Sequence, residues 1–280
     1  MNNLPGKLYV VATPIGNLSD LSPRAAETLN SVDFIAAEDT RVTAKILNHI
    51  GVKKSLVSCQ KYNERERSEQ IVARILAGEN AAFCSDAGTP VISDPGGTLV
   101  AKALDEGITV VPVSGPSAVV SALSVCGLRC ERFCFEGFLP TPKGGRKERL
   151  EELRQEKRTM VFYEAPHKLQ RTLKDMLETF GDRPVTICRE MTKLHEEIWR
   201  TGLGQAKEYY DENPPRGEFV LVISGYEGPE NGETTLEDAA RLAADYMEEG
   251  MSASDAAKRA AKETGFSRSE IYRAAGGKKE

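Results

Sequence analysis

The sequence lacks any hydrophobic run long enough to cross a lipid bilayer. Its 280 residues are 40% hydrophobic and 28% charged, an ordinary composition for a globular protein, and a run of about 18 apolar residues never occurs. The first residues, MNNLPGKLYVVATP, lack the charged, apolar and small-residue regions of a signal peptide. We therefore expect no membrane partner, a location in the cytoplasm, and enough residues for two domains with a small appendage.

The few cysteines and histidines do not have the spacing of a metal site. The chain has six cysteines and three histidines. Cys126, Cys130 and Cys134 recur every four residues, but the second Cys or His pair that zinc sites usually have is missing nearby. We expect no bound metal and, in the cytoplasm, no disulfide. The other cysteines lie in or beside apolar runs and are expected to be small buried residues: Cys59, Cys84 and Cys188.

Glycine-rich phosphate-binding motifs are missing as well. A dinucleotide site would need GxGxxG after the first strand, and the triphosphate motif GxxxxGK[ST] does not occur. The turn after the first expected strand is TPIGN (13–17), in which Pro14 has no backbone N–H and only one glycine is present. A ligand at this turn is therefore not held through phosphates. S-adenosylmethionine fits this constraint, because it has a carboxylate, an ammonium and a sulfonium but no phosphate.

The sequence has no large excess of positive charge, but its basic residues are unevenly distributed. A net charge of −5 argues against a protein that coats nucleic acid non-specifically. Residues 143–158 nevertheless have seven basic against four acidic side chains, and residues 256–280 have seven against three. Such runs are usually solvated surfaces. Two of them in an acidic chain also favour a local contact with nucleic acid.

Apolar runs alternate with helical patterns, which predicts an α/β fold with two mostly parallel sheets. We place a first α/β domain at residues 1–118 and a second at 119–228, joined around a helix at 114–127 that is rich in small residues. One large sheet is the alternative. Strands are expected at 7–13, 32–37, 55–59, 80–85, 108–113, 131–137, 159–164, 184–188 and 218–224. Helices are expected from Ser22, which is followed by Pro23, and at 41–50, 64–77 and 96–106.

A helical C-terminal region is expected at residues 229–280. It follows a linker rich in glycine, proline and glutamate (225–235), and residues 236–276 are rich in alanine and typical of three short helices. Gly265 and Ser267 lie where a helix-turn-helix would have its turn and the start of its second helix. This region is either a hairpin that packs on the main body or a module that docks RNA.

Two further turns follow expected strands, where ligands of open α/β sheets bind. In DAGTPVISDPG (86–96), Asp86 has no evident structural duty and is a candidate ligand for a ribose or a cation, whereas Asp94 is either a helix cap or a ligand. In SGPSA (114–118), hydroxyls and backbone N–H groups at a helix start are suited to a carboxylate or another polar group.

Together, PIGNL, DAGTP and SGPSA resemble the tetrapyrrole-methylase-like class of S-adenosylmethionine methyltransferases, which has two α/β domains with the cofactor in the cleft between them. Longer segments are similar to the bacterial 16S rRNA (cytidine-2′-O)-methyltransferases, which modify a decoding-site cytidine. The resemblance covers about residues 7–225. The segments are LYVVATPIGNLSDLS (8–22), AAEDTR (36–41), SDAGTPVISDPG (85–96), PVSGPSAVVSAL (112–123), FEGFLP (135–140), FYEAPHK (162–168), CREMTKLHEE (188–197) and RGEFVLVI (216–223).

The resemblance implies the cofactor S-adenosylmethionine, the product S-adenosylhomocysteine, 16S rRNA in the small ribosomal subunit as substrate, and a homodimer. Much of the cofactor binding is expected to involve the backbone. A tetrapyrrole or a modified protein residue is the alternative acceptor, and a nonenzymatic RNA-binding factor is a third hypothesis, which the intact turns disfavour. The implied cofactor contacts are Pro14, Ile15, Asp86, Thr89, Ser117, Ala118, Tyr163, Met191 and Gly217.

Catalytic residues are less determined by the sequence. Methyl transfer depends on aligning the nucleophile with the methyl group, and a base adds about 10²–10⁴-fold. Charged residues at strand ends are the candidates, with a surface ion pair between Asp39 and Arg41 as the alternative. His167 is expected to cap, pack or catalyse. A ribose acceptor is favoured because a nucleophilic cysteine loop and an Asn/Asp-Pro-Pro-aromatic motif are both missing from the sequence. The candidate catalytic residues at the strand ends are Glu38, Asp39, Arg41 and Glu190.

Overall fold

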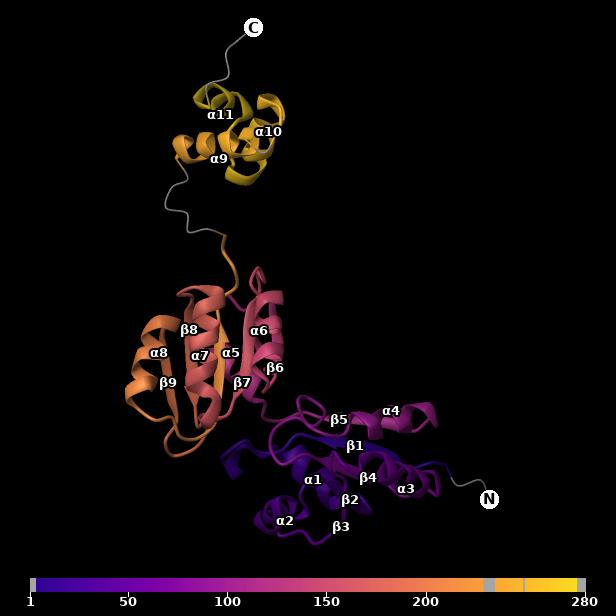
Figure 1. Cartoon of the computed structure of the whole chain (residues 1–280). Helices are drawn as coiled ribbons and strands as arrows, with labels where there is room; N and C mark the ends of the chain where they lie inside the picture. The colour runs from indigo at the N-terminus through magenta and orange to yellow at the C-terminus, as the bar shows by residue number, and fades with distance from the viewer. Residues whose placement is uncertain (1–3, 229–234, 249, 276–280) are drawn as a thin grey trace. The chain divides into compact units, whose positions relative to one another are not determined.

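The computed structural model describes residues 4–228, 235–248 and 250–275 (Figure 1). The chain divides into two compact units, Met1–Tyr226 and Glu227–Glu280. Both predicted sheets lie in the first unit, and the boundary between residues 118 and 119 stays a prediction. Among the described residues, no helix combines the length and the apolar character needed to cross a membrane.

The first sheet is parallel throughout, as predicted, with the strand order β3-β2-β4-β1-β5. Its central strands β2 and β4 are buried at every position, as expected for a parallel sheet covered on both faces. Phe34 and Ile35 point to opposite faces, where they pack in separate cores against α3 and α4 and against α1 and α2. The strands are β1 (Lys7–Val11), β2 (Phe34–Ala37), β3 (Ser55–Ser58), β4 (Ala81–Cys84) and β5 (Thr109–Val113). The helices are η1 (Leu18–Asp20), α1 (Pro23–Ser31), α2 (Thr40–His49), α3 (Glu64–Leu76) and α4 (Gly97–Asp105).

The second sheet has the order β6-β7-β10-β8-β9, and its strand directions differ from the prediction. Only β6 and β7 pair in parallel, because β10 enters between β7 and β8 in the opposite direction and β9 returns from β8 after a short turn. Strand β9 was not predicted, because its residues EIWRTG are half-buried or exposed and form no apolar run. The strands are β6 (Phe133–Phe138), β7 (Thr159–Glu164), β8 (Pro184–Arg189), β9 (Glu197–Gly202) and β10 (Phe219–Ile223).

Four helices cover the second sheet. Residues of α6, α7 and α8 share one core with Met160 and Phe162 of β7, whereas α5 packs on the other face against Val161. Because β6, β7 and β8 run in the same direction, their carboxyl ends lie at the same edge of the sheet as the start of β10. The helices are α5 (Ala118–Val125), α6 (Lys143–Glu152), α7 (Pro166–Phe180) and α8 (Leu203–Glu212).

The C-terminal unit has three helices in its described residues, α9 (Leu236–Glu248), α10 (Ala253–Thr264) and α11 (Arg268–Ala274). They enclose a small core made mainly of alanines with Ile271. The predicted turn is confirmed, because Gly265 ends α10 in the left-handed region (φ 78°) and Ser267 begins α11 with a capping box to Glu270. Residues 229–234 of the predicted linker lie outside the described residues.

Candidate functional site

The three predicted turns meet at the carboxyl edge of the first sheet, because β4, β1 and β5 are parallel neighbours. Thr13 and Gly88 exchange backbone hydrogen bonds of 2.9 and 3.0 Å, which join the first turn to the second. The Thr89 hydroxyl donates to the Pro116 carbonyl at 3.3 Å and joins the second turn to the third. The turns therefore form one connected backbone frame.

A cavity of about 440 Å³ adjoins this frame and is also lined by the edge of the second sheet. Its volume lies in the range of small-molecule sites, about 300–1,000 Å³. Its wall combines apolar side chains with hydroxyls and three carboxylates. The lining residues are Ile15, Ala87, Gly88, Thr89, Ile92, Ser93, Asp94, Ser117, Ala118, Phe138, Tyr163, Glu164, Ala165, Pro166, Met191, Glu218, Phe219 and Val220.

Six of the nine predicted cofactor residues line this cavity: Ile15, Thr89, Ser117, Ala118, Tyr163 and Met191. Pro14, Asp86 and Gly217 are each next in sequence to a lining residue but do not line the cavity themselves. Phe138 and Glu164 also line the cavity but were not predicted, although each ends a strand within the motifs FEGFLP and FYEAPHK. Their position at strand ends was the available signal.

Asp94 is a half-buried carboxylate in the cavity wall, and it does not cap a helix as one interpretation proposed. Gly96 occupies the N-cap of α4 in the left-handed region, and the buried Glu64 carboxylate accepts hydrogen bonds from the N–H groups of Gly96 (3.0 Å) and Thr98 (2.8 Å). Burial raises the pKa of Asp94, and the negative charge of Asp86 raises it further, against a hydrogen bond from Ser85.

Aromatic and acidic groups of the second sheet form the opposite wall. Burial raises the pKa of Tyr163 to about 12, and the charge of Asp94 adds to the rise. The buried Glu164 carboxylate accepts hydrogen bonds from the Thr172 hydroxyl at 2.5 Å and from the Ala165 N–H at 2.8 Å. The end of β7 is therefore held rigidly, as a ligand site requires.

The charged residues predicted at the end of β2 lie beside the frame but do not line the cavity. Asp39 caps α2 and pairs with the exposed Arg41 guanidinium at 2.6 Å, which holds the pKa of this carboxyl to about 2. The Asp39 backbone N–H donates to the Asp86 carboxylate at 2.9 Å, and the Glu38 carboxylate accepts a hydrogen bond from the Asp86 N–H at 3.2 Å. Burial raises the pKa values of both Glu38 and Asp86.

Glu190 lies in the turn after β8, which packs on the first turn. Its carboxylate accepts hydrogen bonds of 2.9 Å from Lys193 Nζ and from the Glu218 N–H, and the Lys193 contact lowers its pKa. A Cβ on Gly217 would lie 2.6 Å from Cγ of Glu190, and one on Gly16 would lie 2.5 Å from Cγ of Lys193. The turns of the two sheets are thus in close contact beside the cavity.

Strained backbone marks two edges of the cavity. Val91 and Ser93 have φ of 75° and 66°, and Glu190 and Thr192 have φ of 52° and 64°. Non-glycine residues rarely adopt this region, and a β-branched residue such as Val91 does so at particular cost. Such strain concentrates at ligand sites, where the surrounding structure enforces it.

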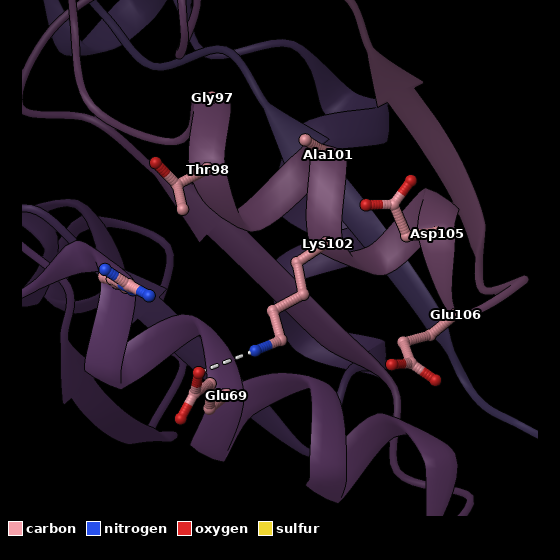
Figure 2. A pocket seen from close by; sticks show the side chains of 8 residues that line it. Glu69, Gly97, Thr98, Ala101, Lys102, Asp105 and Glu106 are labelled. Atoms are coloured by element: carbon pink, nitrogen blue, oxygen red, sulfur yellow. Dashed lines mark hydrogen bonds and ion pairs between the residues drawn. The ribbon is translucent and has the colours of Figure 1, made fainter.

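A second hollow, of about 660 Å³, lies between α3 and α4 (Figure 2). Lys102 spans it and pairs with Glu69 at 2.9 Å, and most of its other lining residues are exposed. Its lining residues belong to α3, to α4 and to the residue after α4, and none of them lines the strand-end cavity. We therefore assign the candidate site to the strand-end cavity.

The described residues contain no cluster of three or more His, Cys, Asp or Glu side chains that could hold a metal ion. All six cysteines are free, although Cys126 Sγ lies 3.3 Å from Cys130 Sγ. The expectation that the protein needs no metal stays a prediction.

Comparison with known proteins agrees with this geometry. Residues 7–207 match the family model of tetrapyrrole (corrin/porphyrin) methylases, and residues 233–279 match that of the RsmI C-terminal HTH domain. The fold is similar to that of uroporphyrin-III-C-methyltransferase from Thermus thermophilus, with a TM-score of 0.57 and 20% identity over 78% of this chain and 94% of the other. The fold and the cavity thus define a methyltransferase of the tetrapyrrole methylase class.

Closer relatives specify the family. The ribosomal RNA small subunit methyltransferase I of Synechocystis sp. is 46% identical, over 95% of this chain and 96% of the relative. The protein of the same name from Pseudomonas aeruginosa is 43% identical, over 96% of each chain. This chain belongs to the ribosomal RNA small subunit methyltransferase I family.

Proposed function

We propose that the protein transfers a methyl group from S-adenosylmethionine to the ribose 2′-hydroxyl of a cytidine in 16S rRNA, at the decoding site. The observation that carries this proposal is the strand-end cavity, whose wall is built from the strand-end turns of a chain 46% identical to a ribosomal RNA small subunit methyltransferase. The small ribosomal subunit as partner, a cytoplasmic location and a homodimer belong to the same proposal and rest on the family alone.

The residues of the cavity fit this cofactor. Ile15, Met191 and Val220 offer an apolar surface for the adenine, and Thr89 and Ser117 offer hydroxyls for its polar groups. The half-buried Asp94 carboxylate provides the negative charge that an ammonium or sulfonium requires. Ser117 is the N-cap of α5 but makes no side-chain capping bond there, so its hydroxyl is not committed to the helix.

The reaction displaces the methyl group from sulfur, so the main task of the protein is to hold the 2′-oxygen in line with it. The hydroxyl proton must also leave, and a carboxylate at the cleft edge would favour this step. We keep Glu38, Asp39, Arg41 and Glu190 as proposed orienting residues. Glu190 is connected to the cavity because its carboxylate holds the backbone N–H of Glu218, which lines it.

Alkaline hydrolysis of RNA methylated in vitro tests the acceptor atom. A 2′-O-methyl group blocks cleavage at its own 3′-phosphate, so small subunits treated with the protein and S-adenosylmethionine should yield one alkali-resistant dinucleotide that contains cytidine. The same subunits treated without S-adenosylmethionine are the control. Complete hydrolysis to mononucleotides with a methylated base would refute the ribose assignment, and methylation of a tetrapyrrole or a protein instead of rRNA would refute the substrate.

A further inference from the structure

Two exposed apolar side chains stand at the mouth of the strand-end cavity. Ile92, in the loop between β4 and α4, is 47% exposed, and Phe138, at the end of β6, is 54% exposed. The two segments that hold them are in contact beside the cavity, because a Cβ on Gly137 would lie 2.9 Å from the hydroxyl of Ser93. Both side chains line the cavity and leave much of their apolar surface accessible.

The backbone beside both side chains departs from regular geometry, with strain at the Ile92 loop and a bulge beside Phe138. Ile92 lies between Val91 and Ser93, both in the left-handed region. Phe138 follows Gly137, which has φ of 62°, and the β6–β7 pairing is interrupted between Phe135 and Gly137 by a bulge. Bulges near active sites redirect side chains, and strained non-glycine residues such as Val91 and Ser93 concentrate at ligand sites.

The aromatic face of Phe138 suits a flat partner. Its ring contacts Tyr163 in an edge-on geometry, with centroids 5.5 Å apart, and Tyr163 is supported in turn by Phe135 at 5.0 Å. Proteins that bind unpaired RNA stack its bases on such aromatic side chains. Enzymes that act on a nucleotide within a structured nucleic acid also take its base out of the stack.

The charges around the mouth favour an uncharged ring inside and a phosphate backbone outside. The cavity wall has the carboxylates of Asp94, Glu164 and Glu218, which repel anions. Basic side chains lie on the helices that come after β6 and β7 in the chain. Lys143 is the exposed first residue of α6, and Lys168 of α7 donates to the Thr141 hydroxyl at 2.9 Å.

We propose that Ile92 and Phe138 form an apolar clamp that holds the nucleobase of the target nucleotide, so that its ribose faces the cavity. The clamp rests on the proposed function and extends it, since it names the residues that position the acceptor. Phe138 and Ile92 are positioning residues, and neither takes part in the transfer of the methyl group.

Kinetics on small ribosomal subunits that lack the methyl group test the clamp in the full-length protein. Phe138→Ala should lower kcat/KM for the subunits by about 5- to 150-fold, the range of one base–aromatic stack, while calorimetry should show unchanged affinity for S-adenosylhomocysteine. Phe138→Trp should restore most of the activity, because it keeps a flat aromatic face. Phe133→Ala is the matched control, since Phe133 is on the same strand and 42% exposed but does not line the cavity.

A second variant tests the other side of the clamp. Ile92→Ala should also lower kcat/KM, and the double variant should lose less than the product of the two single losses because both side chains contact the same base. Wild-type kinetics in Phe138→Ala would overturn the clamp, and a matching loss of S-adenosylhomocysteine affinity would assign Phe138 to the cofactor instead. If the wild type methylates no rRNA, the proposed function fails first and the clamp fails with it.

Discussion

The Asp94 side chain is available to a ligand because a different residue caps the helix that follows it. Its position before Pro95-Gly96-Gly97 is typical of a helix cap, but Glu64 fills that role from α3. The Asp94 carboxylate is left in the cavity wall, half-buried and with a raised pKa. A half-buried carboxylate with a raised pKa in a cavity wall is a candidate for binding a cation.

We expect the affinity for S-adenosylmethionine to fall as the pH is lowered from neutral. The raised pKa means that Asp94 becomes protonated at a higher pH than an ordinary aspartate, and the neutral form no longer attracts a cation. Asp94→Asn should bind about 10-fold or more weakly at neutral pH, the loss of one hydrogen bond to a charged group. Calorimetry across this pH range measures both effects.

The stability of the cofactor-free protein provides an independent check on Asp94. Because its pKa is raised in the folded state, the ionised form destabilises the fold at neutral pH, and this penalty is relieved as the pH falls through the folded-state value. Asp94→Asn should therefore unfold at higher urea concentration than the wild type at neutral pH, with the difference shrinking in acid. A variant that is less stable and binds normally would show that Asp94 has a structural role.

At the scale of elements, turns determine the shape of the site more than the helices and strands do. The turn after β8 and the turn before β10 interlock, since Gly217, with φ of 89°, leaves room for the Glu190 side chain and lies beside Glu218 of the cavity wall. A side chain at position 217 would displace Glu190, and Met191 of the cavity wall with it.

Gly217→Ala should therefore lower both stability and cofactor affinity. Gly107→Ala is the matched control, because Gly107 also has a positive φ (73°) but a Cβ there would have no neighbour within 4 Å. The control should lose about 1–2 kcal/mol of unfolding free energy from backbone strain alone, with normal binding. Urea titration and calorimetry on both variants separate the effect of backbone strain from the effect of a clash with Glu190. Equal losses of stability and of cofactor affinity in the two variants would contradict the interlocking of the turns.

At the scale of the whole molecule, the chain divides into a two-sheet body and a C-terminal unit, and we expect the body to fold without that unit. Tyr226 belongs to the body, because its backbone N–H donates to the Glu156 carbonyl at 2.6 Å and Arg183 lies over its ring. The basic side chains that we expect to contact RNA are all exposed: Lys258, Arg259, Lys262, Arg268 and Arg273.

Ending the chain after Tyr226 should leave a folded body that binds S-adenosylmethionine but methylates small subunits poorly. Each lost phosphate contact removes salt-sensitive affinity, so the activity of the truncated protein should also depend less steeply on salt. The full-length variant Lys258→Gln, Lys262→Gln is the control for charge alone. An unfolded truncation would show that the body needs the C-terminal unit, and undiminished methylation would remove its role in RNA binding.

Much of the fold could be predicted from local sequence. The apolar runs of the first sheet, the Ser22-Pro23 start of α1 and the Gly265 and Ser267 boundaries in the C-terminal unit each depend on neighbouring residues, so their signals are complete within a few positions. The strand-end turns were predictable for the same reason, and parallel strands necessarily bring those turns to one edge.

Other features depend on residues that are far apart in the chain. Glu64 caps a helix that starts more than thirty residues later, and β10 decides the strand directions of the second sheet by entering between β7 and β8. Phe138 and Glu164 line the cavity only because two sheets meet there. The sequence by itself determined the strands of the first sheet, the strand-end turns and the family of this protein, because these follow from local chemistry and motif. Only the tertiary structure decided which of those side chains face the cavity, because that depends on long-range packing.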